Sequence, residues 1–191
     1  MDGRGDKAIF GQLRQTLPDV RKWIDHYVEA YAHLAVPVAE LGFGRLSQYF
    51  YQSRLSTSKA VKVDRVLVPP LSKMGLPYFV NFEETPFAGI TYLDTFFLAP
   101  PVHNCESTHF HELIHVVQWD VLGPDSFLMV YAVGLLTHGY ENSPLERMAY
   151  ELQRVFQAGR SIPQLELQVR EKTLLVAKIA DIGAMEKEER P

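Results

Sequence analysis

The stretch HFHELIH, residues 109–115, decides how the middle of this chain is interpreted. On a helix, His111 and His115 lie about 40° apart on one face, so their imidazoles can converge on one ion. Glu112 falls about 60° from His115, where its carboxylate can reach a water on that ion without binding the ion itself. Two neutral imidazoles with a neighbouring carboxylate are typical of metal-assisted hydrolysis by zinc. The stretch therefore predicts a helix that carries a zinc site.

The opposite side of the same predicted helix is apolar. Phe110, Leu113 and Val117 lie there, and such a face is expected to pack against a sheet and hold the site rigid. His109 points to this rear face, so we interpret it as a structural or capping residue rather than a ligand. The alternative is a half-buried helix that binds no metal, because an H-E-x-x-H pattern also arises by chance.

A third metal ligand is expected downstream, because a catalytic zinc site usually has three protein ligands and one open position. Glu146 is favoured: a helix predicted to begin at Pro144 places it in the first turn, and a helical hairpin can return it to the histidines. The alternative is a capping box, in which Glu146 reaches back to the amide of Ser143. Glu151 is expected to face solvent or to form a pair on its own helix. The remaining candidates are His138 and Glu141.

The periodicity of the chain predicts an α+β fold in a single domain of 191 residues. A small sheet of three or more strands is expected to pack on the histidine helix, with N-terminal and C-terminal helices around them. From the N-terminus we expect a frayed segment (1–15), a helical region (16–54) with helices from Pro18 to about Leu34 and from about Val38 to Arg54, and a sheet region (61–100) with strands at 61–69, 76–84 and 89–100.

The helical period returns after Pro101 and continues almost to the C-terminus. Gly123 and Pro124 are expected to separate the histidine helix from the next one, because both residues interrupt helices. The metal-site helices are expected within 106–157, at about 108–122, 126–137 and 144–157, and a charged amphipathic helix at about 163–181.

Composition and charge exclude several classes of function. The net charge of −4, with scattered Lys and Arg, offers no basic surface for nucleic acid. One cysteine, Cys105, permits neither an internal disulfide nor a Cys-rich metal site. The longest apolar run, FLMVYAVGLL at 127–136, is about half of what a bilayer span needs, so it predicts a buried core helix. With no apolar core of signal-peptide length near the N-terminus, we expect a cytoplasmic protein that binds neither nucleic acid nor a membrane.

Two segments together resemble a known family. HELIHVVQW (111–119) and YENSPLERMAY (140–150) are similar to the gluzincin branch of the HExxH zincins. They are most similar to small stand-alone bacterial domains with an HELxHxxQ helix and a later NxPxERxAY segment. The resemblance runs from about Gly89 to Phe156. It implies a zincin-like fold, a zinc ion held by His111, His115 and Glu146, and Glu112 as the general base.

The chain departs from this family at two positions. Many gluzincins carry an acidic residue four positions after the ligand glutamate, where it orients a ligand histidine; here that position is Tyr150. A tyrosine hydroxyl can form a similar but weaker bond. Met148 stands where related segments often carry a second glutamate. These departures bear on catalytic strength more than on metal binding.

The resulting expectation is a zinc-dependent hydrolase, and more specifically a metallopeptidase that acts on a peptide or protein. Glu112 would accept the proton of the attacking water. The alternatives are a zincin-like interaction module that binds zinc with weak or no activity, and a metal-free helical interaction protein. Several roles stay open: His138, Tyr140 or Tyr150 as a second electrophile or as structural residues, Cys105 as an inert thiol or an inhibitory ligand, Asp94 as a turn or supporting carboxylate, and Trp119 as core or pocket wall.

Overall fold

The computed structural model describes the backbone of residues 3–189 and the side chains of residues 8–180. Within this part, the chain forms six α-helices and a four-stranded mixed sheet, so the predicted α+β class is confirmed. The elements are α1 (Gly3–Tyr31), β1 (Val36–Pro37), α2 (Gln52–Thr57), β2 (Lys59–Lys62), α3 (Val80–Glu83), β3 (Gly89–Tyr92), β4 (Thr95–Leu98), α4 (Glu106–His138), α5 (Pro144–Gln157) and α6 (Leu165–Glu189).

The sheet has the strand order β1-β2-β4-β3. Strands β2 and β4 are parallel, whereas β1 pairs with β2 and β3 pairs with β4 in the antiparallel direction. Every residue of β4 is buried, as expected for an interior strand covered on both faces. Strand β3 lies at one edge of the sheet, and α4 packs directly on it.

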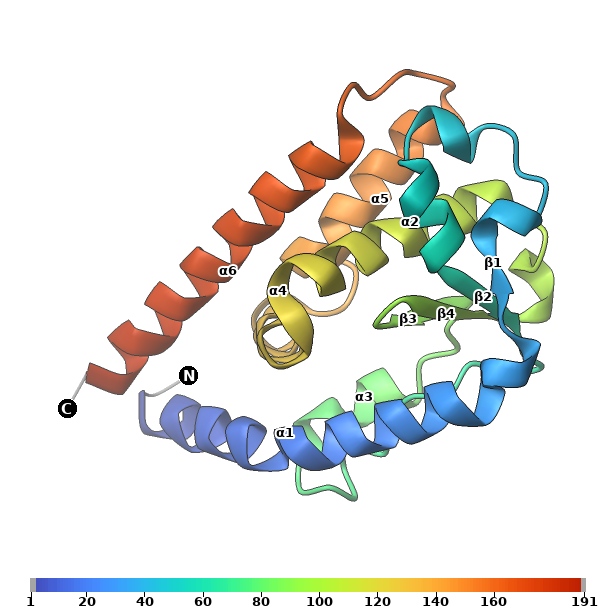
Figure 1. Ribbon diagram of the computed structural model, residues 1–191. Coiled ribbons are helices and arrows are strands. Elements are labelled where there is room, and N and C mark those ends of the chain that lie inside the picture. Colours follow the sequence, from blue (N-terminus) through green and yellow to red (C-terminus); the bar gives the residue numbers. More distant parts are fainter. Residues whose placement is uncertain (1–2, 190–191) are drawn as a thin grey trace.

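Helices cover both faces of this sheet, with α1 on one side and α4 on the other (Figure 1). The alternation of side chains along β4 explains how both faces become buried. Phe96 and Leu98 belong to the core formed with α4. Phe97 belongs to the core formed with α1, where it contacts the ring of Tyr27. The histidine-bearing helix is therefore held against the sheet, as its apolar rear face predicts.

Helix α4 consists of two segments that meet at Gly123, whose backbone is non-helical with a φ of 71°. This bend lies where the sequence predicts the separation of two helices. In the first segment, Phe110, Leu113 and Val117 are buried in the core beside the sheet, which confirms the predicted rear face. Helices α5 and α6 also begin within two residues of their predicted starts.

Among the described helices, α4 alone is long and apolar enough to cross a membrane, with a mean hydropathy of 1.2 in its most apolar window. Length and composition are weak evidence for a span, because core helices of soluble proteins also meet them. In the run 127–136, Phe127, Val130 and Gly134 are buried and the other side chains are partly exposed. The prediction of a fully buried helix is therefore only partly met there.

The N-terminal region is more helical than the sequence predicts. The segment 1–15, expected to fray, is helical from Gly3 onward, and its residues 1–2 lie outside the described part. Phe10 and Leu13 are buried against the segment that precedes α3. This contact stabilises the first turns of α1, and it joins residues far apart in the sequence.

The predicted helix over 38–54 is wrong. Two short 3₁₀ turns, Val38–Glu40 and Leu46–Gln48, precede α2 in this region. Gly42 lies between them with a φ of 77°, a left-handed conformation that ends a helix and favours glycine. The buried apolar residues of this stretch belong to separate short turns: Val38 lies in the first and Leu46 in the second.

The prediction of a strand over 76–84 is also wrong. This stretch forms a 3₁₀ turn, Pro77–Phe79, followed by α3. Leu76 and Phe79 are buried three positions apart, which is a helical spacing. The proline suits the first position of a helical turn, since its missing amide is not needed there.

The other two predicted strands are present in shorter form. The stretch 89–100 divides into the hairpin of β3 and β4, with Leu93 at the turn in a left-handed conformation, φ 59°. In 61–69, strand β2 ends at Lys62. The sheet thus gains its fourth strand from β1, a two-residue edge strand that follows α1.

Candidate metal centre

Three side chains from two helices meet in a buried group that could hold a metal ion: His111, His115 and Glu146. The histidines lie one turn apart on the first segment of α4, and Glu146 lies in the first turn of α5. The Nε2 atoms of the two histidines are 3.1 Å apart. The carboxylate oxygens of Glu146 lie 3.5 Å from Nε2 of His111 and 3.4 Å from Nε2 of His115.

This spacing suits a tetrahedral ion. Donor atoms about 2.1 Å from a zinc ion at tetrahedral angles are about 3.4 Å from one another. The Oε2 atom of Glu146 is buried and has no hydrogen-bond partner. A buried carboxylate oxygen without a donor is costly unless a cation balances it, so a metal ion held by this group would satisfy Oε2.

Two glutamines orient the histidines. The Nδ1 atom of His115 lies 2.8 Å from Oε1 of Gln118, and that of His111 lies 3.1 Å from Oε1 of Gln153. An Nδ1–H group that donates to a carboxamide oxygen leaves the Nε2 lone pair free for a metal. Gln118 is itself held, because its Nε2 donates to the carbonyl of Leu145 at 3.1 Å. Both imidazoles therefore present Nε2 to Glu146.

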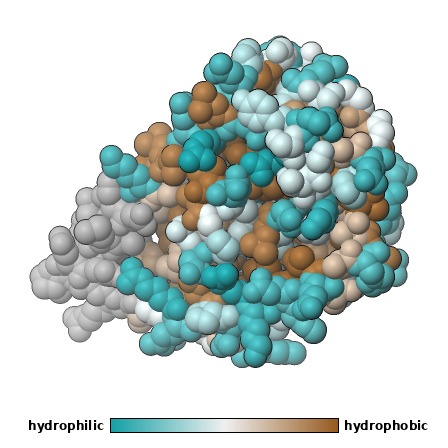
Figure 2. Space-filling model, viewed as in Figure 1, coloured by the Kyte–Doolittle hydropathy of each residue, from teal (hydrophilic) through white to brown (hydrophobic). Residues whose placement is uncertain are grey.

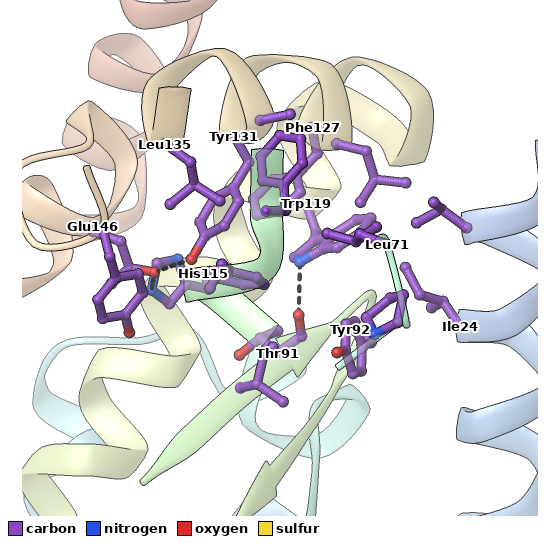
Figure 3. Close-up of a pocket in the computed structure, with 18 of the residues that line it drawn as sticks. Ile24, Leu71, Thr91, Tyr92, His115, Trp119, Phe127, Tyr131, Leu135 and Glu146 are labelled. Carbon is purple, nitrogen blue, oxygen red and sulfur yellow. Dashed lines mark hydrogen bonds and ion pairs between the residues drawn. The ribbon is translucent and has the colours of Figure 1, made fainter. Parts of the chain in front are cut away.

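Tyr131 holds the third member of the group. Its hydroxyl donates to Oε1 of Glu146 at 2.7 Å, from the second segment of α4 (Figure 3). Burial and the neighbouring Glu146 raise the pKa of Tyr131 well above its ordinary value, so the hydroxyl keeps its proton. The carboxylate of Glu146 is thus fixed through Oε1, which also faces His115, while Oε2 faces His111.

The electrostatics of the metal-free group are those of a buried ion pair. Burial would by itself raise the pKa of Glu146, but His115 and His111 hold it below its ordinary value. Burial would lower the pKa of His115, but Glu146 raises it from 6.5 to about 9. A proton on His115 therefore occupies the electrostatic position that a metal ion would take.

Glu112 lies next to this group, and β3 positions its carboxylate. The hydroxyl of Thr91 donates to Oε2 of Glu112 at 2.7 Å. A side chain at Gly89 would collide with Oε1 of Glu112 and come within 2.9 Å of Leu98, so a larger residue there would displace the Glu112 carboxylate. Burial raises the pKa of Glu112, while His111 and His115 act in the opposite direction. A carboxylate with a raised pKa is a better proton acceptor near neutral pH.

The capping box that competed for Glu146 does not form. Ser143 precedes α5, but its side chain makes no capping bond, and its Oγ is buried without a hydrogen-bond partner. Helix α5 begins close to α4 at Gly134. A Cβ atom at this glycine would lie 3.2 Å from both Ser143 and Pro144. This close approach brings Glu146 to the histidines.

The other downstream candidates lie elsewhere. Glu151 pairs with Arg147 at 3.1 Å on the exposed side of α5, as predicted. His138 and Glu141 are exposed. Tyr150 packs against the ring of His111 with centroids 4.6 Å apart, so the residue that accepts the histidine proton is Gln153, and not Tyr150.

Sequence reasoning missed four supporting residues. Gln118 follows His115 by three positions, a spacing that could have indicated its role. For the others no local signal exists, since they reach the group only through the tertiary fold: Thr91 on β3, Tyr131 beyond the bend of α4, and Gln153 two turns into α5.

The remaining candidates are structural. His109 is buried, and its Nδ1 lies 3.0 Å from the carbonyl of Cys105, as expected of a structural residue. Cys105 occupies the N-cap position of α4, and its thiol lies 3.3 Å from the hydroxyl of Ser107. It is not part of the metal group. Asp94 is a turn residue that accepts a bond from Thr95 at 2.8 Å.

A pocket opens directly onto the centre (Figure 3). It contains about 900 Å³ of empty space, including the part that is open to solvent. Trp119 forms one wall, where it stacks on Phe127 and donates to the carbonyl of Thr91 at 3.1 Å. Tyr140 lines the same pocket, and of the three predicted electrophiles it is the one placed there.

Comparison of the chain with protein-family models, with curated proteins and with solved structures returned no match.

Proposed function

We propose that this protein is a zinc-dependent hydrolase, and more specifically a metallopeptidase of the gluzincin type. One observation carries the proposal: two oriented imidazole nitrogens and a carboxylate oxygen without a donor converge in a buried group beside a pocket. A second carboxylate, Glu112, borders the same pocket.

His111, His115 and Glu146 would hold the ion. Two imidazoles and one carboxylate are a donor set that catalytic zinc sites use, with the fourth position open. A zinc ion held there would supply Lewis-acid chemistry, which polarises a carbonyl group and lowers the pKa of water to about 7. Gln118, Gln153 and Tyr131 keep the donors in place, as supporting residues do in other metal sites.

Glu112 would be the general base. Its carboxylate is fixed by Thr91 on one side and lies against Gly89 on the other, so it needs little reorganisation to accept a proton. In the hydrolysis of an amide, a water oxygen bonds to the carbonyl carbon and gives its proton to Glu112. The C–N bond then breaks, and Glu112 returns the proton to the leaving nitrogen.

Elemental analysis of protein purified without a histidine tag tests the metal centre first. We expect one zinc per chain, and loss of zinc in His111→Ala, His115→Ala and Glu146→Ala. His138→Ala and Glu151→Ala are matched controls, because both side chains are exposed and neither belongs to the metal group. Full zinc content in the Glu146→Ala protein would remove Glu146 from the ligand set.

Cleavage of an unbiased peptide library, followed by mass spectrometry, tests the reaction. We expect Glu112→Gln to retain zinc and to lose turnover by about 10²- to 10⁴-fold, since a general base contributes about that much. Zinc at one per chain with no cleavage of any peptide would contradict the metallopeptidase assignment. Absence of zinc in every preparation would leave the metal-free helical protein.

A further inference from the structure

The pocket beside the metal centre has two chemically different ends. At one end lie His111, His115, Glu112 and Glu146. From there it extends between the second segment of α4 and α1 (Figure 3). No Lys, Arg or Asp lines it among the described residues. In the view of Figure 2, apolar residues gather in the hollow between the polar outer surface of α1 and the helices above it.

The wall formed by α1 shows that the apolar end is long. Leu13, Leu17, Val20 and Ile24 line the pocket from one stripe of this helix. Leu13 and Ile24 are eleven positions apart, which corresponds to about 16 Å along the helix axis at 1.5 Å per residue. An extended alkyl chain advances about 1.25 Å per carbon, given its bond length and angle, so this wall matches a chain of about 12 carbons. A single amino-acid side chain is much shorter.

Two polar groups of β3 that border the pocket are already paired, which leaves fewer partners for the backbone of a peptide. The carbonyl of Thr91 accepts from Trp119 at 3.1 Å, and the hydroxyl of Tyr92 donates to the carbonyl of Leu67 at 3.0 Å. A peptide carries an amide donor and acceptor on nearly every residue, and leaving these groups buried and unpaired is costly. A hydrocarbon chain has no such groups.

We propose that the pocket receives the unbranched acyl chain of an amide substrate, with the amide carbonyl at the His-His-Glu group. This inference rests on the proposed hydrolase function and names its substrate class: an amine or peptide acylated by a chain of about 8 to 14 carbons. Water adds to the amide carbon, the C–N bond breaks, and the proton moves through Glu112 to the nitrogen. The products are the chain carboxylate and a free amine.

Binding of alkyl hydroxamates tests this inference without turnover, because the hydroxamate head binds zinc and the tail enters the pocket. Calorimetry with zinc-loaded protein would use tails of 2, 6, 10 and 14 carbons. We expect affinity to rise up to about fourfold per methylene until the pocket is filled, and then to level off. Equal affinity across the series, or a benzyl tail that binds as tightly as the 10-carbon tail, would overturn the acyl-chain assignment.

A space-filling variant supplies the matched comparison. Ala132 lines the pocket on α4, whereas Ala30 is exposed on α1. We expect Ala132→Leu to retain zinc and to weaken the 10-carbon hydroxamate at least tenfold more than the 2-carbon one, because the added side chain takes the space of several methylenes. Ala30→Leu should bind both like the parent protein. An equal effect of Ala132→Leu on both tails would contradict the proposal.

A ligand without a metal-binding head separates failure of the chain pocket from failure of the hydrolase. Titration of 1-decanol into EDTA-treated protein should show binding that Ala132→Leu weakens, whether or not the protein takes up zinc. No decanol binding would overturn the chain pocket and leave the zinc centre standing. Hydrolysis of a decanoylated peptide and of decanoyl ethanolamide then distinguishes an acylated peptide from a lipid amide as the source of the chain.

Discussion

The two segments of α4 perform opposite tasks. Before Gly123, every residue from His109 to Trp119 is buried, including five polar ones that have assigned partners. After Gly123, only Phe127, Val130 and Gly134 are buried among the described residues, and much of the apolar surface faces a pocket. The comparison teaches that the polar side chains are placed among buried partners that orient them, and the apolar surface where a ligand can cover it.

The largest effect is expected from removing the carboxylate that links α5 to the first segment. Glu146→Ala should weaken zinc binding by more than about 10²-fold, since even supporting residues of metal sites contribute 10- to 100-fold. Competition with a zinc chelator measures this. Glu151→Ala, on the same helix and exposed, serves as the control. Similar affinities in the two variants would mean that the first segment binds metal without α5.

The Gly89→Ala variant tests whether the close contact between Gly89 and Glu112 positions the carboxylate of Glu112. The added methyl group would collide with Glu112 and crowd Leu98. We expect hydrolysis to fall by about 10²-fold, the lower range for loss of a general base, while zinc content stays at one per chain. Gly11→Ala, where a Cβ meets nothing within 4 Å, should leave activity unchanged and stabilise α1 slightly. Wild-type turnover in Gly89→Ala would show that Glu112 tolerates displacement.

A smaller effect is expected from the glutamine that orients His111. Gln153→Leu removes the acceptor of the Nδ1 proton and should weaken zinc binding by about tenfold. Gln157→Leu, at an exposed position one turn later on α5, should not change it. If both variants bind zinc like the parent protein, packing alone orients the imidazole.

The smallest expected effect concerns the pH dependence of stability in EDTA-treated protein. Glu146 raises the pKa of His115 from 6.5 to about 9 against the effect of burial. The folded state therefore holds this proton more tightly than the unfolded chain, and the stabilisation is lost as the pH rises from 6.5 through about 9. Calorimetry should show a Tm that falls by a few degrees over this interval.

Zinc-loaded protein should respond in the opposite direction, because the metal requires deprotonated imidazoles and binds more tightly as the pH rises. His115→Ala should remove the fall in the metal-free protein. A Tm of the metal-free parent that rises between pH 6.5 and 9 would show that the buried ion pair does not form.

Local periodicity accounts for what could be predicted. His111, Glu112 and His115 follow from helical spacing alone, and Glu146 follows from a helix start that proline marks together with the need of a zinc site for a third ligand. The structure brings His111, His115 and Glu146 together, while the metal and the reaction stay predictions. Thr91, Tyr131 and Gln153 could not be predicted, because their contacts span 15 to 42 residues of sequence.

The wrong elements have a related cause. The stretches 38–54 and 76–84 contain short turns whose shape depends on what they pack against, rather than on their own periodicity. Leu76 and Phe79, for example, are buried against α1, which begins more than 60 residues earlier. Helices with one apolar face depend less on such contacts: α4 and α5 lie where the sequence predicts them, whereas the first half of α1 was not predicted.

The close contact at Gly134 has a consequence for how the two segments communicate. The start of α5 rests on α4 there, and Tyr131, one turn earlier, holds the carboxylate of Glu146. An occupant that shifts this part of α4 therefore also shifts the third donor of the metal group. Thermodynamic reciprocity then requires that, if the tail of a substrate strengthens zinc affinity by some factor, zinc strengthens the affinity for that tail by the same factor.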